Sequence, residues 1–132
     1  MGKHAIIVIK NKDNYLQYFD TRWDSYLFLN CKVEDNSSEA ITDYVSDLFD
    51  LSKESIQVSY VGEKIHSKYS ESHKEVREYD HYFFQVECFI PSESFTKDSI
   101  KYKWFTFDEL MKDERIQKVN SDIVGFIKEF NL

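Results

Sequence analysis

The carboxylates best spaced to do chemistry lie between Cys31 and Leu51, in the stretch CKVEDNSSEAITDYVSDLFDL. Within it Glu39, Asp43 and Asp47 recur at every fourth residue, a spacing that aligns side chains along one edge of a helix. Carboxylate oxygens in such a row can hold a hydrated Mg²⁺ ion. The same row also describes the solvated side of an amphipathic helix, and acids in a first turn stabilise a helix N-terminus without any ligand. A metal site and a solvated helix face therefore both remain open.

A second set of residues has the chemistry to hold a phosphorylated ligand. Lys and Arg pair with phosphate oxygens, and aromatic faces accept nucleotide bases. The candidate ligand-binding residues are Arg22, Lys32, Arg77, Tyr82 and Trp104, accompanied by Lys64, Lys68 and Tyr79. Alternatively, the aromatic residues pack in the core or on a sheet face, and the lysines only keep the protein in solution.

Other kinds of site find little support in the sequence. The four histidines are scattered without the ligand spacing of a zinc site. Three glycines cannot form a glycine-rich phosphate loop, and no serine stands between two glycines as in a nucleophile elbow. Cys31 and Cys88 lack metal-ligand spacing, so we expect both to be packing residues with reduced thiols.

Length and charge limit the expected partners. The chain has 132 residues, the usual size of one domain, so we expect a single domain over 1–132. Its net charge of -7 disfavours duplex nucleic acid and anionic lipid, because both are bound by neutralising phosphates with Lys and Arg. Near the N-terminus stands only a short apolar run, AIIVI, too short for a signal peptide or a membrane span, so we expect a cytoplasmic protein. Eleven Phe and nine Tyr leave room for a buried homodimer face.

Hydrophobic periodicity predicts the strands that must position these residues. Apolar and β-branched runs bounded by turn residues fall at 4–10, 14–19, 25–30, 55–61, 81–90 and 100–107. Between two of them, the polar stretch 62–80 is expected to be a long loop or the irregular ends of a hairpin.

Helical spacing predicts three helices. The first covers 37–49 with Ser37 or Ser38 as its N-cap, the second begins at Asp108, and the last begins at Asn120 or Ser121. Strands followed by a helix, more strands and two helices favour an α+β fold, with a mixed β-sheet sandwiched by helices.

The segment 31–51 resembles the signature box of the Nudix hydrolase (MutT-like) family. That box runs Gly, five residues, Glu, seven residues, then Arg-Glu-hydrophobic-any-Glu-Glu-any-Gly-hydrophobic. Aligned on Lys32 and Ala40, the chain has Val45 and Leu51 at the hydrophobic positions of the box. Farther on, YKWFTFDEL is similar to the late strand and short helix of the family. In layout the resemblance covers nearly the whole chain.

In the same alignment, this chain has other residues at most of the polar positions of the box. The box Gly becomes Cys31, Arg becomes Asp43, the first Glu becomes Tyr44, the Glu pair becomes Asp47 and Leu48, and the last Gly becomes Asp50. Family members hold one to three magnesium ions with glutamates one helical turn apart. The resemblance therefore implies a metal-binding helix face at positions 44, 47 and 48 that keeps one carboxylate, Asp47, in a degenerate box.

Three hypotheses for function follow from the resemblance and the residues. The first is a catalytically weak or inactive Nudix-type protein that binds a nucleotide-like ligand or a protein partner in the ancestral cleft. The second is a Mg-dependent hydrolase of the pyrophosphate in a nucleoside diphosphate linked to another group; Asp47 with Asp43 or Glu39 would hold the metal, and an acid from a later loop would act as base. The third is an interaction domain without a small-molecule site.

Overall fold

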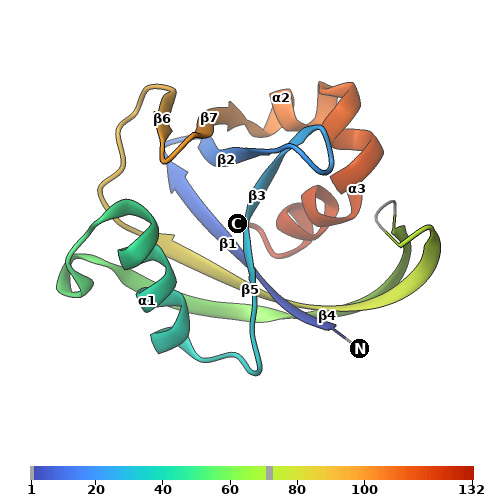
Figure 1. Ribbon diagram of the computed structural model, residues 1–132, viewed down its shortest axis with the longest axis horizontal. Helices are drawn as coiled ribbons and strands as arrows, with labels where there is room; N and C mark the ends of the chain where they lie inside the picture. The colour runs from blue at the N-terminus through green and yellow to red at the C-terminus, as the bar shows by residue number, and fades with distance from the viewer. Residues whose placement is uncertain (1, 71–72) are drawn as a thin grey trace. The chain divides into compact units, whose positions relative to one another are not determined.

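The structure is a computed structural model that describes residues 2–70 and 73–132, drawn as a ribbon in Figure 1. The described strands are β1 (Gly2–Asn11), β2 (Asn14–Asp20), β3 (Ser25–Lys32), β4 (Gln57–Ser70), β5 (Glu75–Glu87), β6 (Phe95–Lys97) and β7 (Ile100–Thr106). The helices are α1 (Ser38–Phe49), the short 3-10 helix η1 (Lys53–Ser55), α2 (Phe107–Lys112) and α3 (Glu114–Glu129). None of the described helices is long and apolar enough to cross a membrane.

Hydrogen bonds join the strands into one sheet in the order β4-β5-β1-β3-β2-β7-β6, with β1 also paired to β2. β1 and β3 are each antiparallel to β2, so they run parallel to each other and the sheet is mixed. This confirms the predicted α+β fold built on a mixed sheet. Contacts divide the chain into two compact units: unit 1 is Met1–Ile7 with Asn30–Ile90, and unit 2 is Val8–Leu29 with Pro91–Leu132.

In unit 1, helix α1 packs against β4 through one apolar stripe. Ile41, Val45 and Phe49 recur at helical spacing and are buried, Ile41 and Val45 completely. The hydroxyl of Ser37 caps the N-terminus by accepting a backbone N–H of the first turn at 3.3 Å. The helix ends before Asp50, whose φ of 55° is left-handed, a conformation that Asp tolerates better than most residues. The predicted helix over 37–49 is confirmed.

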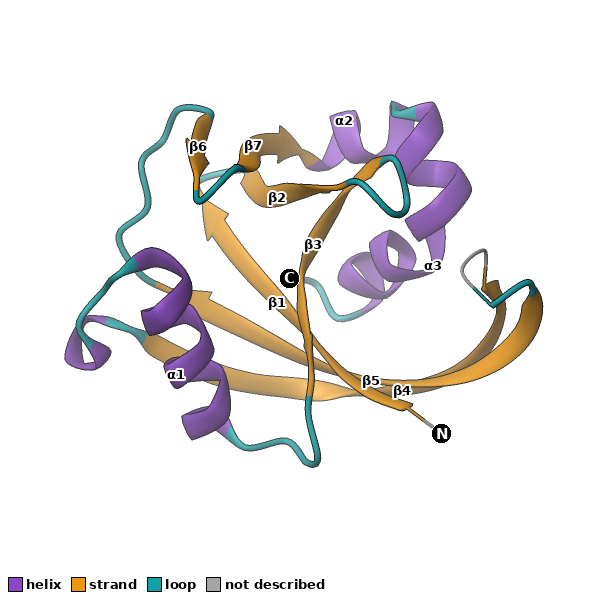
Figure 2. Cartoon of the chain, viewed as in Figure 1, coloured by secondary structure: helices purple, strands orange, loops and turns teal. Residues whose placement is uncertain are grey.

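Most of the polar stretch 62–80 is strand, and Figure 2 shows β4 and β5 as a long, curved pair. The two strands pair antiparallel along their whole length, with one bulge between Tyr60 and Gly62. The expected long loop is therefore wrong, while the hairpin is right. β4 is an edge strand, and half of its side chains are exposed and one is buried, so it lacks the apolar alternation by which a strand is recognised in sequence. Residues 71 and 72 lie outside the described residues.

Unit 2 is organised around β2, which lies between β3 and β7. The hydroxyl of Tyr15 on β2 donates to the backbone carbonyl of Leu132 at 2.7 Å. Arg115 on α3 donates to the backbone carbonyls of Trp23 and Asp24 at 2.6 and 3.0 Å. These bonds tie the C-terminal helix and the chain end to the strands and turn near the N-terminus of unit 2.

The last two helices begin earlier than the sequence predicts. Thr106 caps α2, and its side chain and that of Glu109 form a capping box, so Asp108 lies inside the helix. Asp113 caps α3 through its carboxylate. Asn120 does not start a helix but interrupts α3, with φ of -139° and ψ of 18°. The predicted start at Asn120 is therefore wrong, although it marks a real break in the helix.

Candidate functional site

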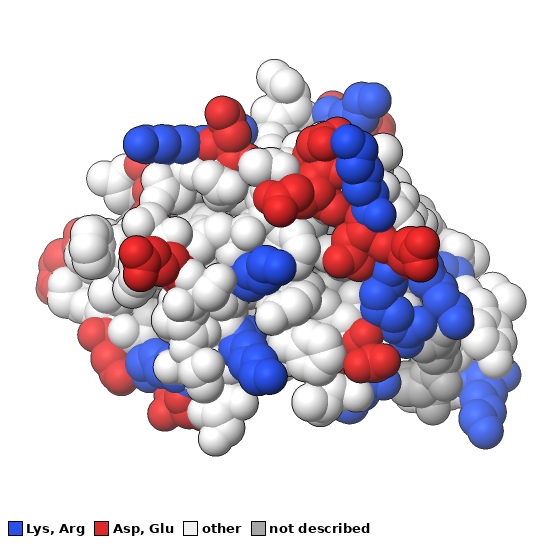
Figure 3. Space-filling model, turned by 90° about the horizontal axis from the view of Figure 1, so that it is seen from above, with Lys and Arg blue, Asp and Glu red and all other residues white. Residues whose placement is uncertain are grey.

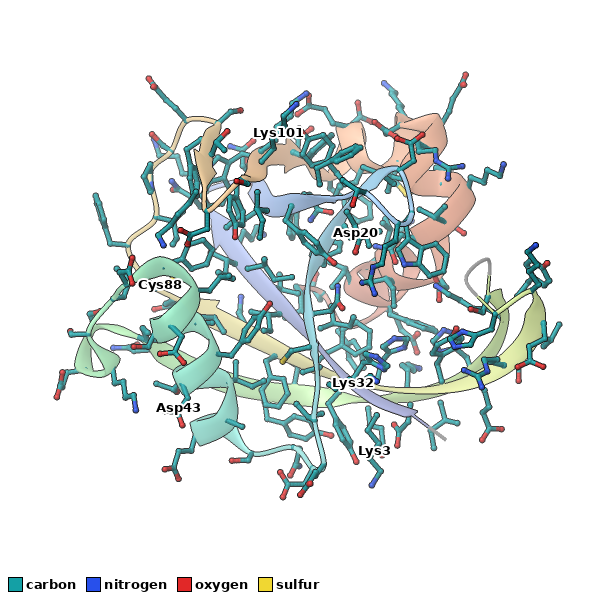
Figure 4. The ribbon with its side chains drawn as sticks, viewed as in Figure 1. Lys3, Asp20, Lys32, Asp43, Cys88 and Lys101 are labelled. Carbon is teal, nitrogen blue, oxygen red and sulfur yellow. The ribbon has the colours of Figure 1, made fainter. Side chains whose placement is uncertain are left out.

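The acidic row on α1 already holds a cation from its own chain. Lys53, in η1, places its ammonium nitrogen 2.9 Å from Oδ1 of Asp43, which Figure 4 labels on α1. The pKa of Lys53 is raised, chiefly by its hydrogen bond and charge attraction to Asp43, and further by the charges of Asp47 and Glu39. The three carboxylates therefore act together on one lysine, as expected of side chains on one helix edge. The side chains of Lys53 and Asp43 are 61% and 47% exposed, so their ion pair adds little stability.

The other positions that the resemblance makes metal ligands supply no further carboxylate. The hydroxyl of Tyr44 donates to the backbone carbonyl of Asn30 at 3.3 Å, Leu48 is half-buried, and Asp47 is exposed. In residues 2–70 and 73–132, no three His, Cys, Asp or Glu side chains come together to hold a metal ion. Because Mg²⁺ demands near-octahedral oxygen ligands, the side chains present do not fit a dedicated magnesium centre.

Three of the predicted ligand-binding residues lie in unit 1. Lys32 is exposed at the end of β3 and is labelled in Figure 4. Arg77 on β5 pairs with Glu75, with Nε 3.0 Å from the carboxylate. Tyr82 is 9% exposed and packs edge-on against Tyr60, with 6.2 Å between ring centroids. Because side chains alternate along a strand, Arg77 and Tyr82 belong to opposite faces of β5.

The other two predicted ligand-binding residues lie in unit 2. Arg22 makes an ion pair of 3.1 Å with Asp20. Burial opposes ionisation of Asp20, but hydrogen bonds from Arg22 and Tyr18 outweigh it and lower the pKa of Asp20. The indole nitrogen of Trp104 donates to the backbone carbonyl of Pro91 at 2.7 Å. Both predicted residues thus have a structural contact within their own unit.

Three histidines that are far apart in the sequence lie together in unit 1. The rings of His66 and His81 are stacked with centroids 5.0 Å apart, and His4 lies 6.2 Å from His81. Tyr79 lies nearly parallel to His81 at 5.8 Å. Burial, and then the charge of Lys32, lower the pKa of His4. Sequence reasoning missed this group because the adjacency of β4, β5 and β1 in the sheet, rather than local spacing, brings its members together.

The same hairpin face carries cations beside the aromatic rings. The register sets Lys68 directly opposite Arg77 and Lys64 opposite His81. The ammonium of Lys68 lies 5.9 Å from the ring centroid of Tyr79. Cations beside aromatic faces are the combination that binds phosphates and bases.

The opposite face of the hairpin holds two carboxyl groups that share a hydrogen bond. Glu63 bonds to Asp80, and this bond, with burial and the charge of Asp80, raises the pKa of Glu63. Lys3, labelled in Figure 4, and the hydroxyl of Tyr82 act in the opposite direction. Asp80 is 4% exposed, and its Oδ1 has no hydrogen-bond partner within the described residues. Nothing in the spacing of these residues in the sequence singles them out.

The two cysteines have the properties of packing residues. Cys31 and Cys88 are half-buried and free, and burial raises the pKa of each thiol to about 11. The thiolate, which is the nucleophilic form, is therefore scarce near neutral pH. Neither thiol is a candidate nucleophile.

Surface charge is mixed in sign. Figure 3 shows acidic and basic side chains interspersed on the face in view. The sequence as a whole has a net charge of -7.

Neither a protein-family model nor a curated protein matches the sequence, but solved structures match it in fold. An Ap4A hydrolase from C. elegans has a TM-score of 0.59 at 12% identity, over 98% of this chain and 96% of its own. A NUDIX hydrolase from Nitrosomonas europaea has a TM-score of 0.58 at 17% identity, over 98% and 87%. An ADP compounds hydrolase has a TM-score of 0.59 at 12% identity, over 98% and 72%. The chain therefore has a Nudix-like fold, as its resemblance to the family box implied.

Proposed function

We propose that this chain is a Nudix-type protein that binds a phosphorylated, nucleotide-like ligand and has lost most or all metal-dependent hydrolysis. The observation that carries this proposal is the Lys53 ammonium, 2.9 Å from Asp43 and within the influence of Asp47 and Glu39. A lysine partly neutralises the acids that would have to attract Mg²⁺. A metal ion would have to displace this ammonium before it could bind the row.

The composition of the helix face supports the same conclusion. Tyr44, Asp47 and Leu48 stand where the resemblance puts three glutamates, so the box is degenerate. A phenol engaged by a backbone carbonyl and a half-buried leucine cannot replace carboxylates as magnesium ligands. What remains is a helix that keeps its packing face and one of three metal-binding positions.

Ligand binding is supported by the cationic and aromatic face of the β4–β5 hairpin. Lys64, Lys68 and Arg77 stand there beside His66, His81 and Tyr79. Lys and Arg side chains donate to phosphate oxygens, and a base could lie on an aromatic face. Lys32 is near enough to this group to lower the pKa of His4.

A second candidate function is the ancestral magnesium-dependent hydrolysis. One observation favours it: Asp47 is exposed, and a magnesium ion at a phosphoryl-transfer site often takes only one or two carboxylates, with substrate phosphates as the other ligands. In that case the phosphates of the substrate would have to supply most of the metal ligands.

One set of measurements decides between these functions. The wild-type protein is titrated calorimetrically with MgCl₂ and MnCl₂, and its melting temperature is followed with Ap4A, ADP and a nucleoside diphosphate sugar, each with and without metal. Release of phosphate or nucleoside monophosphate is assayed in the same samples. We expect a nucleotide to raise the melting temperature without metal and without turnover.

Variants locate the site within unit 1. Lys32→Gln should lower the affinity for the nucleotide. Lys118→Gln, which removes the same charge from an exposed position of α3 in unit 2, should leave this affinity unchanged. Turnover that requires divalent metal and disappears in Asp47→Ala would establish the hydrolase instead. If neither nucleotide nor metal binds at millimolar concentration, an interaction domain without a small-molecule site is favoured.

A further inference from the structure

Unit 2 contains a small surface hollow that the proposed function does not use. It has a volume of about 190 Å³ and is lined by Asn11, Lys12, Asn14, Ser92 and Trp104. We call it the turn pocket, because three of these five residues belong to the turn that joins β1 to β2. All five belong to unit 2, and none lies on α1 or on the β4–β5 hairpin.

Strand pairing fixes the positions of the pocket residues. Asn11 and Asn14 face each other across β1 and β2, and residues directly opposite in an antiparallel pair point to the same side. Trp104 is paired with Leu16, two residues beyond Asn14 on β2, so Asn14 and Trp104 share that side as well. Lys12 adopts φ of 56°, the left-handed conformation that closes the tight turn.

A hydrogen bond holds the remaining wall of the pocket. The indole nitrogen of Trp104 donates to the carbonyl of Pro91 at 2.7 Å, and Ser92 follows Pro91 directly in the chain. The bond therefore fixes the ring of Trp104 relative to the backbone that carries Ser92. The pocket has one rigid aromatic wall and several polar side chains around it.

The chemistry of the lining suits an oxyanion. Lys12 brings an ammonium, Asn11 and Asn14 bring carboxamides, and Ser92 brings a hydroxyl, while no carboxylate lines the hollow. Within the described part of the chain no hydrogen bond or ion pair is recorded for these four side chains. The one acid of the turn, Asp13, is exposed and is not part of the lining. Ammonium and amide groups that line one hollow can donate to phosphate oxygens, the ammonium with a charge-assisted bond.

The size of the hollow limits the ligand. Pockets for whole cofactors and drug-sized ligands have volumes of roughly 300–1,000 Å³, so 190 Å³ accommodates a single phosphoryl group better than a nucleotide. We propose that the turn pocket binds a small oxyanion, either inorganic phosphate or the phosphate of a small monoester. This site goes beyond the proposed function, because its residues and its ligand differ from those of unit 1.

Trp104 provides a direct readout of binding. The chain has two tryptophans, so a ¹H–¹⁵N spectrum shows two indole signals, and Trp23→Phe identifies the one from Trp104. Inorganic phosphate is titrated at constant ionic strength, with chloride as the reference ion, and glycerol 3-phosphate is titrated in parallel. Phosphate should shift the Trp104 signal saturably, and the stronger of the two ligands identifies the source of the phosphoryl group.

Two lysine variants test the assignment. Lys12→Gln should weaken phosphate binding by about tenfold or more, the weight of one charge-assisted hydrogen bond, and Lys118→Gln should leave it unchanged. The melting temperatures of both variants should equal that of the wild type, because both lysines are exposed.

Several outcomes would overturn the proposal. They are a Trp104 signal that does not move, a shift that chloride reproduces, and equal affinity in wild type and Lys12→Gln. A phosphate titration that is weakened by Lys32→Gln but not by Lys12→Gln would also overturn the turn pocket while supporting the ligand site of unit 1. Conversely, loss of nucleotide binding in unit 1 does not affect the result for Trp104, so the two proposals fail separately.

Discussion

Helix α1 and the β4–β5 hairpin both carry carboxylates, yet unit 1 places them in opposite environments. On α1, Asp43 is about half exposed and has the Lys53 ammonium at 2.9 Å. On the hairpin, Glu63 shares a hydrogen bond with Asp80, which is 4% exposed. In the first arrangement a lysine ammonium compensates the carboxylate charge, whereas in the second the hydrogen bond to Asp80 favours the protonated form of Glu63. The comparison teaches that the number of acidic residues in a segment does not predict a metal site. The cationic side chains that pair with these residues and their burial must also be known.

The row on α1 is the one that sequence spacing reveals, and it is occupied by a lysine. The pair on the hairpin is the one that spacing does not reveal, and it is where ionisation is perturbed. Variants of α1 and of the hairpin test the two arrangements separately.

The largest effect is expected from Ile41→Ala, which removes the packing that holds α1 in place. Ile41 is fully buried, so the variant should lose about 2–5 kcal/mol of unfolding free energy. Urea unfolding measures the loss. Asp47→Ala, on the exposed side of the same helix, should change the free energy by less than about 0.5 kcal/mol. Equal losses in the two variants would contradict the division of α1 into a packing face and a solvated face.

Asp80→Asn tests the hairpin pair. Because the pKa of Glu63 is raised in the folded state, that state binds the proton more tightly than the unfolded chain. The resulting stability is present below the ordinary pKa of 4.5 and is lost as pH rises through the raised pKa. Without the Asp80 charge this loss should become smaller, so the variant should be more stable than wild type at neutral pH.

The measurement for Asp80→Asn is urea unfolding at pH 4, 5.5 and 7, with the pKa of Glu63 followed by carboxyl ¹³C NMR. Glu78→Gln, an exposed carboxylate on the same strand, is the control and should leave both quantities unchanged. A pH profile of Asp80→Asn parallel to that of wild type would contradict the effect of Asp80 on the pKa of Glu63.

Lys53→Gln tests the α1 side. Removing the ammonium should raise the affinity of α1 for Mn²⁺ roughly three- to tenfold, the effect of one unit charge near a surface site. Proton relaxation enhancement during an Mn²⁺ titration measures it. Lys112→Gln is a matched control, because Lys112 pairs with Asp108 at 2.8 Å on α2 and is likewise exposed. Unchanged affinity in Lys53→Gln would mean that the lysine does not block metal binding.

The smallest effect concerns the histidine group. Burial first, and then the charge of Lys32, lower the pKa of His4. The unfolded chain therefore binds the proton more tightly, and this contribution to stability is lost as pH falls from above 6.5 through the folded pKa. In Lys32→Gln the pKa of His4 should rise, but not to 6.5, because burial remains. An NMR titration of the imidazole signals measures it, and an unchanged pKa would contradict the assigned role of Lys32.

The helix α1 could be predicted because its information is local. Ile41, Val45 and Phe49 repeat at helical spacing, and Ser37 caps the turn before them. The β4–β5 hairpin could not, because β4 is an exposed outer strand whose polar residues show no apolar alternation. Asn120 is an intermediate case. The sequence predicted the start of a helix there, and the structure has an interruption of α3 at the same residue.

The candidate sites divide in the same way. The row of Glu39, Asp43 and Asp47 follows from spacing alone, and the charges of all three raise the pKa of one neighbour. That the neighbour is Lys53 depends on how η1 follows α1. The grouping of His4, His66 and His81 depends on three strands, and no local pattern encodes it.

By itself the sequence determined the α+β class and the amphipathic helix over 37–49, because composition and helical periodicity are local properties. Only the tertiary structure decided which charges meet: Lys53 with the acids of α1, Glu63 with Asp80, and the polar residues of the turn pocket with Trp104. The physical reason is that ionisation and ligand binding depend on distance and burial in space. Strand pairing sets those quantities between residues far apart in the chain.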